Sequence, residues 1–303
     1  MYRIGTQRAD AHEDAIWAVA WSKTNNTIAT GGCDEMVRLW DGSDLTKPLH
    51  SFEKSFELAV VGVDFSGDGK QVVTSSLDGY CRVFDVESKQ KIHQIDSGPA
   101  GTWDIAHHPS LALFASGKKS GGVKVYDTTT GEGKMDMESK DGQFSMCVAY
   151  SPDGACLASG DANGAVHIFD TATGKTLQQL GGHTRPVRSV AFSTDSQLLF
   201  TGSEDKHTSV FDVKNGQQVA HMSTHLSWVL AVAVSPAAGS NSSILATAGA
   251  DKKVKVWDWQ QRESLFCSDA HTEQAWNLAY NQDGTRLVSV GDDGALNMYN
   301  ISD

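Results

Sequence analysis

The stretch AWNLAYNQDGTRLVSVGDDGALNMYN, residues 275–300, contains three apolar runs of alternating pattern, separated by Asp-Gly turns. Alternating apolar and polar residues predict β-strands, and Asp-Gly between two such runs predicts a tight hairpin. The stretch ends on an aromatic residue and a polar one, and six earlier stretches end on an aromatic-Asp pair in the same context. These pairs recur every 42 to 46 residues and are Trp40-Asp41, Phe84-Asp85, Tyr126-Asp127, Phe169-Asp170, Phe211-Asp212, Trp257-Asp258 and Tyr299-Asn300.

The length of this repeat decides the architecture. A period of ~40–45 residues that ends in an aromatic-Asp pair is the signature of WD repeats, each of which forms one four-stranded blade of a β-propeller. The fourth strand is predicted to follow the pair, as in residues 175–180. We therefore predict an all-β fold in which residues 1–303 form a single seven-bladed WD-repeat propeller. Its repeats end near residues 41, 85, 127, 170, 212, 258 and 300.

The two ends of the chain predict how the ring closes. The last repeat ends at residue 300 and is followed by three residues, too few for a fourth strand. A strand-like segment at residues 2–8 precedes the first repeat. We predict that this segment pairs with the third strand of the last blade, because closure removes exposed sheet edges. The one large irregularity, residues 235–243, is predicted to be a longer surface loop.

Composition excludes several classes of function. The chain has 25 basic and 37 acidic residues, a net charge of −12, and no run of Lys and Arg that would favour direct nucleic-acid binding. It has no apolar span of ~18 residues and no N-terminal apolar segment of the secretory type. Its five cysteines are odd in number and form no CxxC pair, as expected of buried free thiols in a reducing compartment. We expect an intracellular, soluble protein that is monomeric by itself and binds no membrane.

Four repeats carry a His, a Ser or Thr and an Asp at fixed offsets. A single Ser-His-Asp set would suggest a hydrolase, but an enzyme needs one set beside a pocket rather than four around a ring. The recurrence instead predicts a structural hydrogen-bond network within each blade: Asp accepts from His, His links to the hydroxyl, and the hydroxyl reaches an indole where Trp is present. By this criterion only repeats 1 and 6 have all four members. The predicted network residues are His12, Thr30, Asp34 and Trp40; His183, Thr201 and Asp205; His225, Thr247, Asp251 and Trp257; and His271, Ser289 and Asp293.

The other repeats and motifs indicate no chemistry. Repeat 2 keeps Asp78 without a matching His, and repeats 3 and 4 have Ser120 and Asn163 where Asp would lie, so these blades are predicted to rely on packing. The adjacent His107 and His108 would point to opposite faces of a strand and could not share a metal. No HExxH, P-loop or GxGxxG motif occurs. We predict a protein without enzymatic activity, metal or cofactor.

A set of large side chains is predicted at one mouth of the central channel. One position after the apolar residue that opens each innermost strand lies at the rim, and it holds Trp17, Val61, Trp103, Met146, Arg188, Leu230 and Trp276. Trp and Arg dominate binding hot spots, and one narrow channel is not expected to bury three tryptophans. Trp228 and Asp14 lie close by in the sequence. We predict a pocket for a short linear peptide with an apolar anchor, and the acidic charge favours Arg or Lys on that peptide.

With the repeats aligned, the chain resembles the WD-repeat subunits of the superkiller complex, the WD repeat-containing protein 61 family. The resemblance covers essentially the whole chain. It departs from the family at Gly121-Gly122 and in the Ser-rich segment 239–243. It rests on residues 11–21, 98–103, 149–154, 170–175, 183–189, 227–230 and 287–293.

The resemblance implies a non-catalytic scaffold. Family partners are a tetratricopeptide protein and an RNA helicase that supply messenger RNA to the exosome for 3′-to-5′ decay, and in animals also the polymerase-associated factor complex in transcription elongation. A location in cytoplasm and nucleus follows. In this family partners bind the top face, and the positions that match here are Asp14, Trp17, Trp103, Trp228 and Trp276. The alternative is a generic WD-repeat adaptor such as a ubiquitin-ligase substrate receptor, which typically has an Arg-rich pocket, whereas this rim offers only Arg188.

Overall fold

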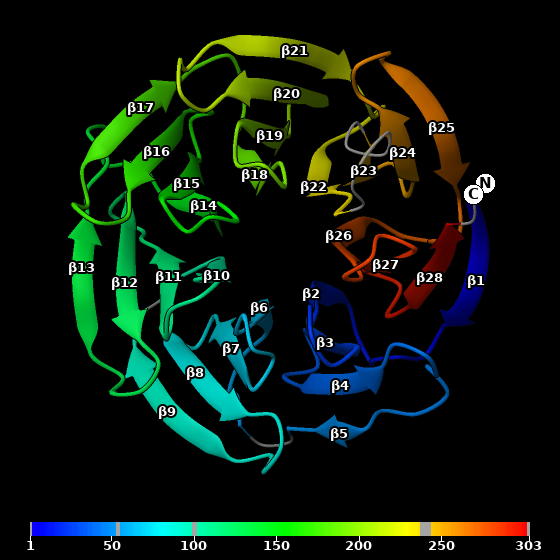
Figure 1. Cartoon of the computed structure of the whole chain (residues 1–303). Helices are drawn as coiled ribbons and strands as arrows, with labels where there is room; N and C mark the ends of the chain where they lie inside the picture. The colour runs from blue at the N-terminus through cyan, green and yellow to red at the C-terminus, as the bar shows by residue number, and fades with distance from the viewer. Residues whose placement is uncertain (1, 53–54, 99–101, 237–243, 302–303) are drawn as a thin grey trace.

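The computed structural model describes residues 2–52, 55–98, 102–236 and 244–301. It contains seven four-stranded antiparallel sheets, arranged as blades around a central channel (Figure 1). Within each sheet the strands follow one another from the channel to the outer edge, so the predicted all-β, seven-bladed propeller is confirmed.

The strand boundaries follow the sequence repeats closely. Blades 1 to 3 consist of β2 (Ile16–Trp21), β3 (Thr27–Gly32), β4 (Val37–Asp41), β5 (His50–Ser51); β6 (Val60–Phe65), β7 (Gln71–Ser76), β8 (Tyr80–Asp85), β9 (Lys91–Asp96); and β10 (Ile105–His107), β11 (Leu113–Gly117), β12 (Val123–Asp127), β13 (Gly133–Met137). Blades 4 and 5 consist of β14 (Ser145–Tyr150), β15 (Cys156–Asp161), β16 (Val166–Asp170), β17 (Thr176–Leu180); and β18 (Val187–Phe192), β19 (Leu198–Ser203), β20 (His207–Asp212), β21 (Gln218–Ser223). Blades 6 and 7 consist of β22 (Val229–Val234), β23 (Ile244–Gly249), β24 (Val254–Asp258), β25 (Glu263–Ser268); and β26 (Ala275–Tyr280), β27 (Arg286–Gly291), β28 (Leu296–Ile301), β1 (Tyr2–Arg8).

The N-terminal strand closes the ring, as predicted. β1 is antiparallel to β28, with Tyr2 opposite Ile301 and Arg8 opposite Leu296, and it forms the outer edge of the seventh blade. Figure 1 shows the two chain ends side by side on this blade. The Tyr2 ring also lies 5.9 Å from the ring of Phe266 in β25, so β1 contacts the sixth blade as well.

The hydrophobic core lies between neighbouring blades. One cluster, for example, joins Ala29 and Leu39 of the first blade to Val63 and Phe84 of the second. The aromatic residue of each signature pair belongs to such a cluster and is almost fully buried, which stabilises the fold by about 2–3 kcal/mol per side chain. Because each sheet buries its faces only against its neighbours, the seven blades form one cooperative unit.

Turn chemistry fixes the hairpins between the inner strands. At Asp153-Gly154 the Asp carboxylate accepts a hydrogen bond from the Ala155 N–H, and Gly154 has a positive φ of 74°. A Cβ on this glycine would lie 2.6 Å from the ring of His108 in the neighbouring blade, so glycine is required for space as well as for φ. Of the loop predicted at residues 235–243, residues 237–243 lie outside the described part of the chain.

The structure also bears on the cysteines and on membrane-spanning helices. All five cysteines are free thiols; Cys81 and Cys147 are buried as expected, whereas Cys267 on an outer strand is exposed. The part of the chain that the structure describes holds no helix that is long and apolar enough to cross a membrane.

Candidate functional site

Bulges in the inner strands turn the predicted rim residues toward the channel. In every blade except the third, the pairing of the two inner strands skips one residue, as between Ile16 and Ala18 of β2. A β-bulge re-aims a side chain, and here it directs the skipped residue at the channel. The skipped residues are Trp17, Val61, Met146, Arg188, Leu230 and Trp276. Together with Trp103, which precedes β10, they line a central cavity of ≈ 490 Å³.

Three tryptophans form a continuous aromatic cluster across this mouth. The Trp17 ring stacks on that of Trp103 with centroids 6.2 Å apart, and it lies 5.7 Å from the ring of Trp276 at a tilted angle. Asp292 holds two of the indoles, because its Oδ1 accepts hydrogen bonds from Nε1 of Trp17 at 3.1 Å and of Trp276 at 2.6 Å. Side chains from blades 7, 1 and 3 thereby meet as one unit, which we call the aromatic bar. All three remain partly exposed.

Arg188 extends the aromatic bar to the fifth blade. Its guanidinium lies 5.7 Å from the ring of Trp103, within the range of a cation–π interaction. The same guanidinium donates two hydrogen bonds, of 2.7 and 2.5 Å, to Glu204 Oε1. The charge of Arg188 is therefore already paired.

The remaining predicted rim residues have different environments. Met146 and Leu230 are only 7% and 4% exposed, so they form the channel wall and offer little contact area to a partner. Trp228 does not line the cavity but is 42% exposed on the loop before β22, and Asp14 is exposed with its carboxylate bonded to the N–H of Ala15.

The sequence patterns did not identify one exposed apolar residue near the channel mouth. Leu226, two residues before Trp228, is 85% exposed, and its N–H donates to Asp251. The His-x-x-x-apolar pattern had not singled it out, because it lies in the loop rather than at the bulge. Leu226 and Trp228 together form what we call the blade 6 patch.

The predicted His-hydroxyl-Asp sets form hydrogen-bond networks inside their blades. In blade 1, His12 Nδ1 lies 2.8 Å from Asp34, its Nε2 lies 2.7 Å from Thr30 Oγ1, and the Trp40 indole donates to the same hydroxyl at 2.9 Å. The sets of blades 5, 6 and 7 have the same geometry, with His–Asp distances of 2.8, 2.7 and 3.0 Å. None of these sets lies among the residues that line the central cavity.

The titration behaviour of the blade 1 pair agrees with a structural role. Burial raises the pKa of Asp34, but the hydrogen bonds and charges of His12 and Arg38 outweigh it, and the pKa falls to about 2. Burial lowers the pKa of His12 more than Asp34 raises it. A carboxylate held ionised beside a neutral imidazole is a fixed hydrogen-bonded pair and not a general base poised near neutral pH.

Two predictions about the networks were wrong. Blade 7 also has a fourth member, because the Tyr299 hydroxyl lies 3.1 Å from Ser289 Oγ; a phenol can replace the indole. The degenerate blades do not rely on packing alone. Asp78 pairs with Arg82 at 2.8 Å, Asp161 lies 3.3 Å from His167 Nε2, and blade 3 has a hydroxyl pair between Thr102 and Ser116 at 2.8 Å.

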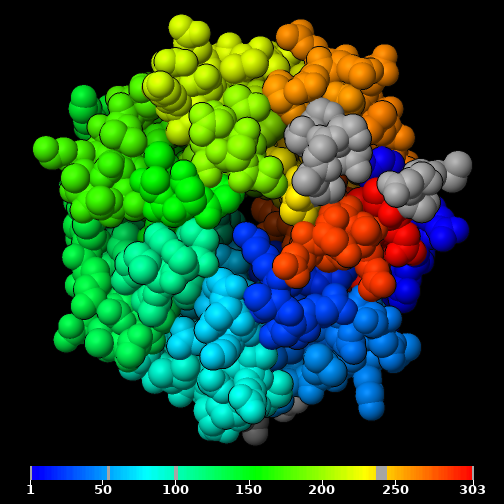
Figure 2. Space-filling model, viewed as in Figure 1, coloured from blue at the N-terminus to red at the C-terminus, as the bar shows by residue number. Residues whose placement is uncertain are grey.

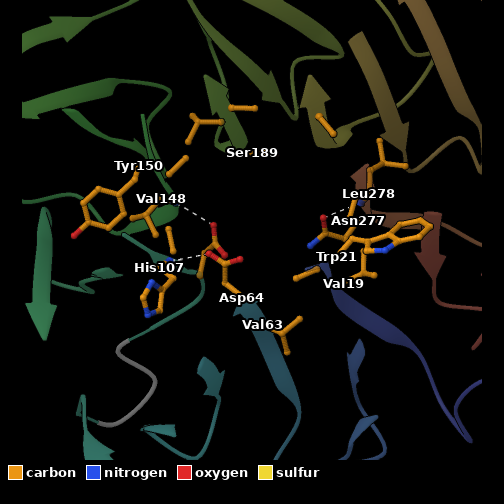
Figure 3. A pocket seen from close by; sticks show the side chains of 18 of the residues that line it. Val19, Trp21, Val63, Asp64, His107, Val148, Tyr150, Ser189, Asn277 and Leu278 are labelled. Carbon is orange, nitrogen blue, oxygen red and sulfur yellow. Dashed lines mark hydrogen bonds between the residues drawn. The ribbon is translucent and has the colours of Figure 1, made fainter. Parts of the chain in front are cut away.

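Halfway along the channel, polar side chains link neighbouring blades. Asp64 accepts the N–H of His107 at 2.7 Å, Asp104 accepts the N–H of Val148 at 3.0 Å, and Ser189 accepts the N–H of Val232 at 3.1 Å. Asn277 in turn lies 3.5 Å from the Trp17 carbonyl oxygen. In Figure 3 Asp64 lies beside His107, and Asn277 faces the cavity from the other side. We call Asp64, Asp104, Ser189 and Asn277 the channel waist; the sequence analysis had not identified it.

Metal chemistry finds no support in these groups. Among residues 2–52, 55–98, 102–236 and 244–301, no three His, Cys, Asp or Glu side chains are arranged to hold a metal ion. His107 Nδ1 donates to the carbonyl of His108, and His108 Nδ1 accepts from the backbone of Ser110 and Leu111.

Comparison with known proteins agrees with this architecture. The family model of the WD domain, G-beta repeat, matches residues 5–41, 46–85, 140–170, 174–212, 216–258 and 262–300. The chain is therefore a WD-repeat β-propeller. The matched stretches include the three inner strands of six blades, while β9 and the whole third blade, β10 to β13, lie outside them.

Relatives that match over nearly the whole chain identify the family within the WD-repeat proteins. The chain is 35% identical to superkiller complex protein 8 of Dictyostelium discoideum and 35% identical to WD repeat-containing protein SL1-17 of Schistosoma mansoni, in each case over 99% of both chains. It is 32% identical to WD repeat-containing protein VIP3 of Arabidopsis thaliana over 60% of this chain and 61% of that protein. The chain belongs to the superkiller complex protein 8 family of WD-repeat proteins.

Proposed function

We propose that this protein is a non-catalytic scaffold of the superkiller complex that supports exosome-mediated 3′-to-5′ decay of messenger RNA. Its partners there would be a tetratricopeptide protein and an RNA helicase. A second role in transcription elongation, within the polymerase-associated factor complex, and a location in both cytoplasm and nucleus belong to the same proposal. The support is the family membership together with an acidic chain that has no basic run for RNA.

The observation that best supports a scaffold function is the preformed aromatic bar. Three tryptophans in ring contact, two of them hydrogen-bonded to Asp292, lose little conformational freedom when a partner binds, which favours affinity. The blade 6 patch adds exposed apolar area outside the channel. Aromatic anchors surrounded by polar groups are the usual composition of a protein–protein hot spot.

The chemistry of this surface indicates the kind of partner. The aromatic bar and the blade 6 patch suit apolar side chains, and the exposed Asp14 favours a basic residue next to them. We propose that a short linear segment of the tetratricopeptide partner binds here, with an apolar anchor and an Arg or Lys.

The alternative adaptor function is less well supported. A receptor for phosphorylated segments needs free Arg side chains, whereas Arg188 is bound to Glu204 and to the Trp103 ring. An enzyme is likewise less well supported, because the His-hydroxyl-Asp sets are internal to the blades and absent from the cavity lining.

The proposal is tested by affinity purification from native extract with mass spectrometry. The wild-type protein is compared with the triple variant Trp17→Ala/Trp103→Ala/Trp276→Ala and with Leu177→Ala, which removes an exposed apolar side chain from an outer strand. Far-UV circular dichroism and a melting curve show that each variant is folded.

Wild type and Leu177→Ala should recover a tetratricopeptide protein and a helicase, and the folded triple variant should lose both. Equal recovery by all three proteins would contradict the assignment of the mouth. Absence of these partners from the wild-type sample would contradict the complex itself.

A further inference from the structure

The central cavity has different chemistry at its two ends. The aromatic bar spans the mouth at which the inner strands begin. At the other end the lining consists of residues that follow the inner strands, among them Lys23, Pro109 and Gln282. The face shown in Figure 2 is hollowed at its centre, where the ring encloses the channel. The cavity is therefore bounded at one end by the indoles of the aromatic bar and along its walls by the channel waist.

Two carboxylates of the channel waist form no close ion pair with a described side chain. Asp64 accepts the N–H groups of Phe65 and His107, and Asp104 accepts those of Ile105 and Val148. In the described part of the chain, no side-chain nitrogen of Lys, Arg or His forms an ion pair with either carboxylate within 4.0 Å. Burial raises the pKa of Asp64, and the more distant charges of His107 and Lys23 only partly offset it. Two negative groups in one desolvated cavity without a counter-ion are costly.

A separate observation also points to a missing hydrogen-bond donor. His107 is 8% exposed and lines the same cavity, and its Nδ1 lies 2.8 Å from the carbonyl of His108. Because a carbonyl can only accept, Nδ1 donates this hydrogen bond, which leaves Nε2 as the ring nitrogen available to a ligand. Neither His107 Nε2 nor the hydroxyl of Tyr280, another lining residue, has a partner among the described groups.

We propose that the channel waist binds a small linear organic cation with primary ammonium groups, of the polyamine class. An ammonium group offers three N–H donors, which match the carboxylates of Asp64 and Asp104 and the unpartnered acceptors. The indoles of the aromatic bar add cation–π attraction for a positive group beside them. A divalent metal fits less well, since the described residues supply no set of three metal ligands. This inference does not depend on the proposed scaffold function.

The site should respond to pH because a proton competes with the cation. The pKa of Asp104 is raised to about 7, because burial, helped by the nearby charge of Asp64, outweighs two backbone hydrogen bonds that lower it. A cation binds the ionised form, so affinity should be roughly tenfold weaker at pH 6 than at pH 8. The other titratable or charged groups that face the cavity are Lys23, Asp64, His107, Tyr150, Arg188 and Tyr280.

Isothermal titration calorimetry of the full-length protein with spermidine, at pH 8 and pH 6, tests the proposal. The key variant is Asp104→Asn, which removes one charge. The matched control is Asp170→Asn, which makes the same change of charge at the end of β16, outside the cavity lining. Tetramethylammonium, which has no N–H, and Mg²⁺ serve as control cations. Asp64→Asn is the second charge variant, should Asp104→Asn not fold.

Wild type and Asp170→Asn should show saturable spermidine binding at pH 8 and the expected weakening at pH 6. The folded charge variant should lose at least tenfold in affinity, and both control cations should bind at least tenfold more weakly than spermidine. Absence of saturable binding at pH 8 would overturn the proposal. So would unchanged affinity in the charge variant, or equal affinity for tetramethylammonium or Mg²⁺.

Discussion

Replacing Thr247 by Val tests the network of blade 6 at its central atom. The Thr247 side chain is fully buried, and its hydroxyl lies 2.8 Å from His225 Nε2 and accepts from the Trp257 indole at 2.9 Å. Valine has nearly the same shape, but it leaves His225 Nε2 and Trp257 Nε1 without this hydrogen-bond partner. Each buried polar group that loses its partner costs about 1–3 kcal/mol, so the free energy of unfolding should fall by about 2–5 kcal/mol.

Thr201 in blade 5 provides a matched control. Its hydroxyl lies 2.7 Å from His183 Nε2, but the aromatic residue of this blade is Phe211, which has no N–H to donate. Thr201→Val should therefore cost only about 1–3 kcal/mol. The difference between the two variants measures the indole bond, and it should disappear when Thr247→Val is made in a Trp257→Phe background.

Urea unfolding at pH 7, followed by far-UV circular dichroism, gives the comparison. The midpoints are interpreted as stability changes only if the slope with denaturant is the same in all variants. Equal destabilisation by the two Thr→Val changes, or a loss below about 0.5 kcal/mol for Thr247→Val, would refute the network as the source of stability.

Three further predictions concern ring closure and titration. Deletion of residues 1–8 should lower stability by several kcal/mol, because it removes the edge strand of blade 7; an unchanged melting temperature would contradict the importance of closure. Burial raises the pKa of Asp251, but its hydrogen bond with His225 and its neighbours lower it to about 2, below the ordinary 3.8, so its contribution is present above pH 4 and lost as the pH falls toward 2. Urea midpoints at pH 5, 3.5 and 2.5 should therefore fall less for Asp251→Asn than for wild type, and parallel curves would count against the pair. Asp104 should have the opposite effect, because its pKa is raised to about 7 in the folded protein. Its contribution to the free energy of unfolding should therefore fall as the pH rises from about 4 to 7. Asp104→Asn should remove this decrease from a plot of stability against pH.

The repeat made the fold predictable from sequence. An aromatic-Asp pair every 42 to 46 residues predicted seven blades, and the segment at residues 2–8 predicted the closing strand, because a ring of antiparallel sheets has few other solutions. The channel-lining positions were also predictable. The period places equivalent residues at the same height, and Trp17, Trp103 and Trp276 do line one cavity.

The details of the site depended on contacts between distant repeats. The hydrogen bond from Trp17 to Asp292 joins residues 275 positions apart, and no local sequence pattern predicts it. Asp64 and Asp104 belong to no motif of the sequence, and only the ring brings them into one cavity. The exposure of Leu226 and the bond of Tyr299 to Ser289 likewise follow from loop conformation and side-chain direction.

Hydroxyl-radical footprinting of the protein, alone and within its complex purified from native extract, shows directly whether partners bind the face that carries the blade 6 patch. The blade 6 patch is reactive by exposure, since Leu226 is 85% and Trp228 42% exposed, and Leu177 and Leu265 on outer strands are comparable internal controls at 50% and 46%. We predict that oxidation of Leu226 and Trp228 falls in the complex, while oxidation of Leu177 and Leu265 does not change. Protection of the outer-strand leucines with an unprotected blade 6 patch would show that partners bind elsewhere on the ring.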